Sequence, residues 1–166
     1  MTELTEQDVA ARVPSLADEQ LKVLSRREPL TVQPGTSLAE CLRIVQRSGV
    51  GDSVIVADAS GRLVGVLTER DIFGKLIRAG ADLSRPVESL MNTSPHTLRM
   101  DSTVREALEL MQTGRFRNVP IIDEDDVLVS IVREQDILKY LAETFPEELL
   151  NLPPRPHQQM QESEGA

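Results

Sequence analysis

The sequence predicts an α+β protein made of two β-α-β-β-α units that are related by a pseudo-twofold axis. The first observation is a repeat, because an apolar run leads into an acidic helical run at 65–72 and again, altered, at 130–137. The second is that a Thr-Val pair at 31–32 recurs as Thr-Leu at 97–98. An internal duplication near 65 residues, in a chain of 166, predicts two small units that share one core.

The first unit is expected to begin with a short strand that a Pro-Gly turn stops. Ser37 and Glu40 then have the spacing of a capping box, which predicts the start of a helix. An Asp-Ala-Ser-Gly turn at 58–61 joins two apolar runs, as in a β-hairpin. The expected elements are a strand at 31–32, a helix from 37 to about 49, strands at 53–57 and 63–67, and a helix from about 69 to 78.

The second unit repeats this order with one residue fewer between its first helix and the next strand. Thr103 and Glu106 form the equivalent capping pair. Four consecutive acidic residues at 123–126 stand where the first unit has its hairpin turn. We interpret them as a solvated turn rather than a cation site. The expected elements are a strand at 97–98, a helix ending at Gly114, strands at 119–122 and 127–132, and a helix from about 134 to 143.

The regions outside the repeats are predicted to be a helical extension and a Pro-rich tail. Thr5 and Ser15 each precede an acid by three residues, as helix N-caps do. The apolar stripe of the extension is thin and needs a partner surface. The expected segments are the extension at 1–28, the first repeat at 29–84, the second repeat at 85–145, and the tail at 146–166, disordered toward its end.

The composition excludes several classes of function. A formal charge of −9 and only three Phe and one Tyr argue against a nucleic-acid binder, which needs a basic footprint or stacking aromatics. The single cysteine, Cys41, forms no intramolecular disulfide and aligns with Ala107, so we expect a small core residue there. No apolar run approaches 18 residues and the N-terminus carries no signal-peptide pattern. We therefore expect a cytoplasmic protein that binds neither nucleic acid nor membrane.

The repeated motif resembles that of CBS domains, which occur as tandem pairs called Bateman modules. The signature of that family is a strand ending in Gly-x-[Val/Leu/Ile]-Thr-x-x-Asp before a helix, with an Arg-x-x-Pro-Val-like strand upstream. These strings stand here at 65–71 and 117–123, and the resemblance covers 29–143. The resemblance implies two small mixed sheets of three strands each, which interleave and are backed by helices. It also implies two clefts that bind AMP, ADP, ATP or S-adenosylmethionine.

The resemblance implies roles for individual residues. Asp71 and Asp136 stand where a carboxylate holds both ribose hydroxyls, since one carboxylate accepts several hydrogen bonds. Thr68 stands where a hydroxyl contacts the ribose or α-phosphate, although Thr68 with Asp71 also fits a helix cap. Apolar Val66 and Ile131 would flank the adenine. Backbone groups of two segments would read the edge of the adenine, those near Asp52 and Ser53 and those near Phe116, Arg117, Asn118 and Val119. The other candidates lie beside the signature positions or on the entry strands: Arg70, Gln135, Thr31 and Thr97.

The second repeat departs from the pattern of the family. Arg133 replaces the usual hydroxyl residue and Ser130 replaces the usual Gly. A polyphosphate between Arg133 and Arg117 would relieve their repulsion, so the Asp136 cleft is predicted to favour ADP or ATP. Alternatively, Arg133 fills this cleft. We expect two unequal sites or one working site, with Arg115 as a further phosphate anchor.

The sequence predicts a non-enzymatic regulatory module that senses adenosine-containing ligands. It would signal by a change of conformation to an effector protein that the sequence does not identify. The alternative is a structural or protein-interaction module with degenerate clefts. An enzyme is disfavoured, because the sequence holds no nucleophile–base pair, metal cluster or Walker-type loop. A homodimer through the helices after the signature strands is expected, since those helices carry Ile72, Phe73, Leu76, Ile77, Ile137, Leu138, Tyr140 and Leu141.

Overall fold

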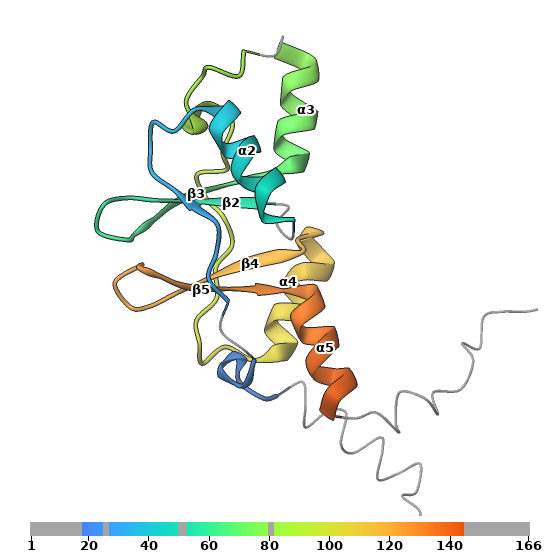
Figure 1. Ribbon diagram of the computed structural model, residues 1–166. Helices are drawn as coiled ribbons and strands as arrows, with labels where there is room; N and C mark the ends of the chain where they lie inside the picture. The colour runs from blue at the N-terminus through green and yellow to red at the C-terminus, as the bar shows by residue number, and fades with distance from the viewer. Residues whose placement is uncertain (1–17, 25–26, 50–52, 80–81, 145–166) are drawn as a thin grey trace, which may run out of the picture.

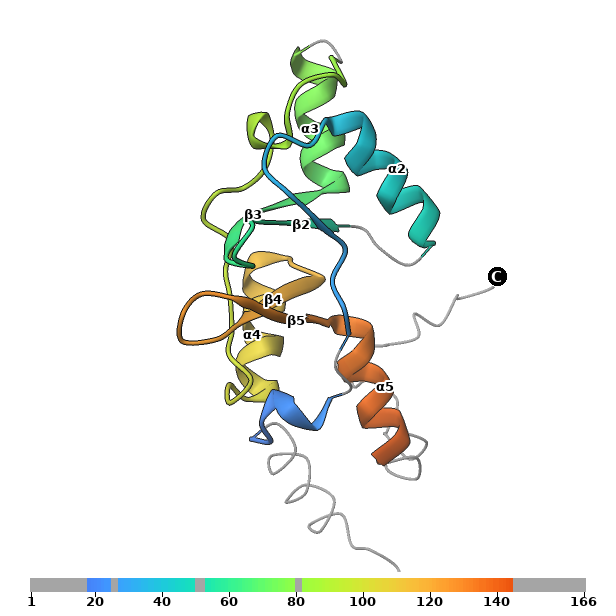
Figure 2. The ribbon, with the colours of Figure 1, turned by 60° about the vertical axis from the view of Figure 1, so that its left-hand side comes forward.

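The structure, a computed structural model, describes residues 18–24, 27–49, 53–79 and 82–144. In chain order its elements are the 3-10 turn η1 (Leu21–Val23), β1 (Thr31–Val32), α2 (Leu38–Ser48), β2 (Ser53–Ala57), β3 (Leu63–Thr68), α3 (Glu69–Ala79), the 3-10 turn η2 (Val87–Ser89), α4 (Val104–Gly114), β4 (Asn118–Ile122), β5 (Leu128–Arg133) and α5 (Glu134–Thr144). The β2–β3 and β4–β5 hairpins meet in the middle of the molecule, with α2 and α3 toward one end and α5 toward the other (Figure 1; Figure 2). The predicted α+β class and the repeated element order are confirmed.

The first repeat is built on a three-stranded sheet of order β1-β2-β3. Strand β1 pairs parallel to β2, with Thr31 opposite Ile55, and β2 pairs antiparallel to β3. All five residues of β2 are buried. A central strand covered on both faces reads as a continuous apolar run, which is why residues 53–57 carry no polar alternation.

The second repeat has a two-stranded antiparallel sheet, β4 with β5. The expected strand at 97–98 is wrong in extent, because it is reduced to one parallel bridge between Leu98 and Ile121. The backbone N–H groups of Leu98 and Ile122 still bond across this bridge, to the carbonyls of Pro120 at 3.1 Å and Leu98 at 3.0 Å. The symmetry of the repeats is therefore kept in contacts although it is lost in strand length.

Two helices begin with the caps that the sequence predicts. Ser37 Oγ accepts a hydrogen bond from the Glu40 N–H at 3.3 Å at the start of α2. At the start of α4, Thr103 Oγ1 accepts from the Glu106 N–H at 3.2 Å, and the Glu106 carboxylate accepts from the Thr103 N–H at 2.6 Å. Each cap satisfies amides that the first helical turn leaves without partners. The predicted buried cysteine is also confirmed, and burial raises the pKa of the Cys41 thiol.

Each of the two 3-10 turns, η1 and η2, packs into the core that the helices and strands of the other repeat form. Leu21 on η1, ahead of β1, is buried against α4 in the second core, and Val87 on η2, ahead of α4, is buried in the first core. Equivalent backbone bonds hold them, from the Leu21 N–H to the Ser102 carbonyl and from the Val87 N–H to the Thr36 carbonyl, both at 2.8 Å. This exchange ties the two repeats together.

The two hairpins also meet at their turns. The Leu63 N–H donates to the Asp126 carbonyl at 3.1 Å, and the Leu128 N–H donates to the Gly61 carbonyl at 3.0 Å. The two bonds are related by the repeat, so the local pseudo-twofold axis passes between them. The hairpin turns are thereby fixed at one end of the contact between the repeats.

The N-terminal extension is described from residue 18 onward, where it rests on α4 and α5. Tyr140 donates its hydroxyl to the Glu19 carboxylate, which raises the pKa of Tyr140, and Arg105 Nε lies 3.1 Å from Asp18 Oδ1. The helices expected before residue 18 and the tail at 146–166 lie outside the described residues, and the proposed segment boundaries stay a prediction. Among the helices of the described part, none is long and apolar enough to cross a membrane.

Candidate functional site

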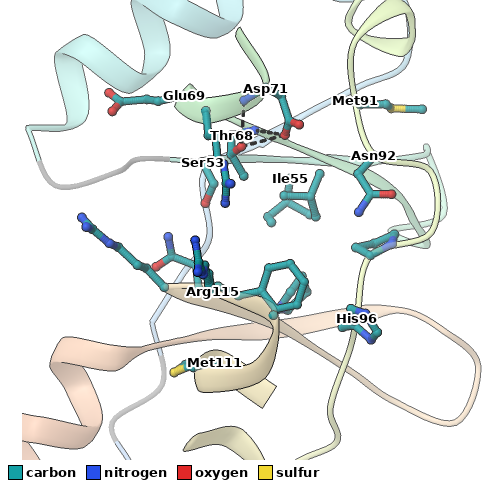
Figure 3. Close-up of a pocket in the computed structure, with 18 of the residues that line it drawn as sticks. Ser53, Ile55, Thr68, Glu69, Asp71, Met91, Asn92, His96, Met111 and Arg115 are labelled. Atoms are coloured by element: carbon teal, nitrogen blue, oxygen red, sulfur yellow. Dashed lines mark hydrogen bonds between the residues drawn. The ribbon is translucent and has the colours of Figure 1, made fainter. Parts of the chain in front are cut away.

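A cavity of about 930 Å³ lies between the two repeats, in front of Asp71. The first repeat contributes β2, β3 and the start of α3, and the second contributes the end of α4 and the start of β4. Figure 3 shows Ser53, Ile55, Thr68 and Asp71 on one side, facing Arg115 and Met111 on the other, with Asn92 and His96 beside them. A ligand in this space touches both repeats at once.

Thr68 and Asp71 form a reciprocal cap at the start of α3. The Thr68 N–H and hydroxyl donate to Asp71 Oδ2 at 3.1 and 2.6 Å, and the Asp71 N–H donates to Thr68 Oγ1 at 3.2 Å. The capping interpretation of this pair is therefore confirmed. The cap also fixes the rotamer of Asp71, whose half-buried side chain lines the cavity. A carboxylate fixed in this way is preorganised for a ligand, because it loses little side-chain entropy on binding.

One wall of the cavity is apolar. Ile55 and Val66 lie opposite each other in the β2–β3 register, and Pro120 reaches the cavity from the equivalent position on β4. The rings of His96 and Phe116 stand 5.2 Å apart, tilted by 47°, and both line the cavity. Such a wall suits a flat heterocycle, since rings stack on aromatic and aliphatic surfaces.

The other lining side chains are charged. Among the described lining residues the cations are Arg70, Arg115 and Arg117, and the carboxylates besides Asp71 are Glu69 and Glu134. Arg115 follows α4 in a left-handed conformation, at φ 55° and ψ 35°. The three arginines and the start of α3 line the same cavity, so they can together bind an anionic group such as a phosphate.

The connector between the repeats closes the cavity along β3. Val66 and Asn92 exchange backbone hydrogen bonds, at 3.0 Å from the Val66 N–H and 2.8 Å from the Asn92 N–H. Gly65 permits this approach, because a Cβ there would stand 2.7 Å from Met91 Sδ and 2.8 Å from the Asn92 carbonyl oxygen. The glycine of the signature therefore serves close packing of the connector.

The equivalent carboxylate of the second repeat has a different partner. Both oxygens of Asp136 accept from one guanidinium, from Arg27 Nη2 at 2.7 Å and from Arg27 Nε at 3.3 Å. This ion pair raises the pKa of Arg27, first through the hydrogen bond and then through the Coulomb attraction. A second cavity, of about 570 Å³, lies near the β2–β3 turn. Neither cavity is lined by Asp136, Ile131 or Arg133.

The structure brings seven of the predicted residues to one place. The cavity in front of Asp71 is lined by the predicted residues Asp71, Thr68, Val66, Arg70, Ser53, Arg117 and Asn118. Thr31 lines the second cavity instead, and Gln135 is exposed outside both. Asp52 lies outside the described residues. Ligand contact by these residues stays a prediction.

One expectation is corrected, and two others stay predictions. The Val119 side chain is 1% exposed and packs into the second core, so only its backbone groups, which were predicted to read the adenine edge, stay candidates for ligand contact. Thr97 lines neither of the two cavities. Arg117 and Arg133 do not share the second cleft, since Arg117 lines the cavity of Asp71 while Arg133, opposite Asn118 in the β4–β5 register, lines neither.

Reasoning from sequence missed the connector and the end of α4. The missed lining residues are Ile55, Glu69, Met91, Asn92, Thr93, Pro95, His96, Met111, Gln112, Gly114, Pro120 and Glu134. Comparison of the two repeats could have identified Ile55, which occupies the position of Pro120.

The described residues hold no cluster of three or more His, Cys, Asp or Glu side chains that could bind a metal ion. Asp123 in the acidic turn instead accepts from the backbone of Asp125 and Val127.

Comparison with known proteins defines the class. The family model of the CBS domain matches residues 21–78 and again residues 87–143. The chain therefore belongs to the CBS-domain family and carries the domain twice in tandem. An uncharacterized protein of Methanopyrus kandleri is 31% identical over 130 residues, which are 76% of this chain and 66% of that protein. The chain thus spans about two thirds of the length of that relative.

Solved structures share the fold. CBSX2 in complex with AMP superposes with a TM-score of 0.66 at 25% identity, over 75% of this chain and 97% of that one. The cytosolic domain of the Mg²⁺ channel MgtE in complex with ATP gives 0.63 at 31% identity, over 79% of this chain and 53% of that one. Both similar proteins were thus solved with an adenine nucleotide.

Proposed function

We propose that this protein is a non-catalytic regulatory module that binds an adenosine-containing ligand in the cavity of Asp71. The candidates are AMP, ADP and ATP, with S-adenosylmethionine as a further one. The observation that carries the proposal is that one cavity combines the fixed carboxylate of Asp71, an apolar wall and three arginines. Its volume falls within the range of about 300–1,000 Å³ that small-molecule sites occupy.

The lining residues suggest how the ligand lies. Asp71 accepts hydrogen bonds from the vicinal ribose hydroxyls. The adenine lies against Ile55 and Val66, and the phosphates face Arg70 and Arg115 near the start of α3. The AMP and ATP complexes of the similar proteins support this class of ligand.

The signal would be a change in the relative orientation of the repeats. The ligand contacts both repeats, so it binds one orientation more tightly than another and shifts the population between them. The output would pass to an effector protein.

A homodimer is also proposed, because two apolar side chains stand exposed at equivalent positions. Phe73 on α3 is 64% exposed and Leu138 on α5 is 56% exposed. Ile72 and Ile137, which were also expected at this surface, are buried in the cores instead. The side chains of Leu76 and Ile77 lie outside the described part.

Titration calorimetry of the full chain with adenosine, AMP, ADP, ATP and S-adenosylmethionine tests the proposal, with GMP as a control for the base. We expect at least one adenosine ligand to bind and GMP to bind more weakly. A bound ligand also raises the stability, by about 2.7 kcal/mol at a hundredfold excess over Kd. If none of these ligands produces heat or a rise in Tm at millimolar concentration, the clefts are degenerate and the interaction-module alternative stands.

A further inference from the structure

The carboxylate of the second repeat that corresponds to Asp71 is already paired with a side chain of the protein. Asp136 stands in the second repeat where Asp71 stands in the first. Its two carboxylate oxygens accept from Nη2 and Nε of Arg27, at 2.7 and 3.3 Å. Vicinal ribose hydroxyls would present two donors to such a carboxylate, and the planar guanidinium presents two donors in the same way.

Ser130 holds the backbone of Arg27 in place. Its hydroxyl accepts from the Arg27 N–H at 3.3 Å and donates to the Arg27 carbonyl at 3.1 Å. Ser130 is buried, with 3% of its surface exposed. Serine instead of the usual glycine at position 130 therefore has a structural reason, because the Ser130 hydroxyl bonds to both the N–H and the carbonyl of Arg27.

The first repeat lacks both parts of this arrangement. Glycine at 65 leaves no side chain to bind the connector, and Thr68 donates to Asp71 as a cap. In the second repeat Arg133 replaces the hydroxyl donor, and Asp136 receives Arg27 instead. The two sequence departures, at 130 and 133, thus fit one arrangement.

We propose that Arg27 is an internal occupant of the second cleft, which takes the hydrogen bonds of Asp136 that a ribose would take. This inference rests on the proposed function. The chain then binds one adenosine ligand, at Asp71, and the second site stays closed until Arg27 leaves. Arg27 rather than Arg133 makes the two clefts unequal.

The occupant is displaceable. The Arg27 side chain is 43% exposed and that of Asp136 is 16% exposed, so water screens the ion pair on one side. Arg27 lies in the segment that joins η1 to β1, and η1 packs into the second core. A ligand that displaced Arg27 would therefore act on the segment that runs from η1, in the second core, to β1, in the sheet of the first repeat.

Titration calorimetry with AMP on the full chain tests this proposal through the number of sites. We expect the wild type to bind one AMP per chain and Arg27→Ala to bind two. Asp71→Ala should bind none, whereas Arg27→Ala combined with Asp71→Ala should bind one, in the second cleft. Arg27→Gln keeps the side-chain stem and should also open the second site, which guards against a folding defect in Arg27→Ala.

The control is Arg105→Ala, which breaks another exposed ion pair of the extension, that with Asp18, outside both clefts. It should still bind one AMP. One site in Arg27→Ala and Arg27→Gln, with melting curves like the wild type, would overturn this inference and leave the proposed function standing. Two sites in the wild type would do the same. Failure of every variant to bind AMP or the other adenosine ligands would remove the proposed function and this inference with it.

Discussion

Arg115 adopts the left-handed conformation that Gly49 adopts at the equivalent position of the first repeat. Each residue ends the first helix of its repeat, Gly49 at φ 63° and Arg115 at φ 55°. A left-handed residue other than glycine costs about 1–2 kcal/mol through the contact of its Cβ. Arg115 also lines the cavity, so a strained residue lies at the candidate site.

Arg115→Gly should therefore raise stability and weaken binding of a phosphorylated ligand. We expect a gain of about 1 kcal/mol in the free energy of unfolding in urea. The affinity for ATP should fall at least tenfold, which is about 1.4 kcal/mol. As a matched control, Gly49→Ala should cost stability, because residue 49 has a φ of 63°, and should leave binding unchanged, because Gly49 does not line the cavity. Unchanged ATP affinity in Arg115→Gly would remove this residue from phosphate recognition.

Gly65→Ala should destabilise the protein through the connector. The new Cβ would stand 2.8 Å from a backbone oxygen of Asn92, which has no room to yield without breaking its bonds to Val66. The expected cost is about 1–3 kcal/mol, measured from the urea midpoint. Gly74→Ala is the control, because Gly74 lies on α3 with nothing within 4 Å and should gain about 0.5–1 kcal/mol. Equal effects at both positions would contradict the close approach.

Asp71→Ala should weaken nucleotide binding by more than about 1.5 kcal/mol, because it removes charge-assisted hydrogen bonds to the ribose. Asp71→Asn keeps the shape and part of the cap, and should still lose much of the affinity. Thr103→Ala removes a helix cap far from the cavity, so it should cost about 1 kcal/mol of stability and no affinity. Calorimetry and thermal melting separate the two effects. Full affinity in Asp71→Asn would leave Asp71 as a cap only.

Phe73→Ser together with Leu138→Ser should give a monomer if the wild type is the proposed twofold dimer. Removing two exposed apolar side chains takes away the contact area that holds such an interface together. Light scattering at micromolar concentration gives the mass. Val23→Ser, at an apolar residue that is 41% exposed on η1, should leave the mass unchanged. A wild-type protein of monomer mass would rule the dimer out.

The sequence predicted those features that depend on neighbours in the chain. The caps at Ser37 and Thr103 form as the spacing indicated. The Asp58 turn forms too, and hydrogen bonds from Ser60 and Arg62 lower the pKa of Asp58. Buried and half-buried strands were visible as apolar runs. These signals are local, because a cap or a turn is satisfied within about four residues.

Half of the candidate cavity was also visible in the sequence. Asp71, Thr68, Val66 and Arg70 lie in one signature string, and the fold keeps them together because a strand runs directly into a helix there. The contribution of the connector was missed. Asn92 and His96 reach the cavity through the path of the connector, and no periodicity or spacing encodes that path.

The sequence by itself thus determined the duplication, the order of elements and the place of the two carboxylates. The sequence also indicated the Thr68 cap of Asp71, but only the tertiary structure decided which partner Asp136 has. Arg27 and Asp136 are 109 residues apart, and their contact depends on the exchange of leading segments between the repeats. The same long-range packing placed Arg117 at the cavity that Asp71 lines. Such contacts form because segments far apart in the sequence bury apolar side chains in shared cores. The free energy of that burial depends on the whole chain, so no short stretch of the sequence predicts it.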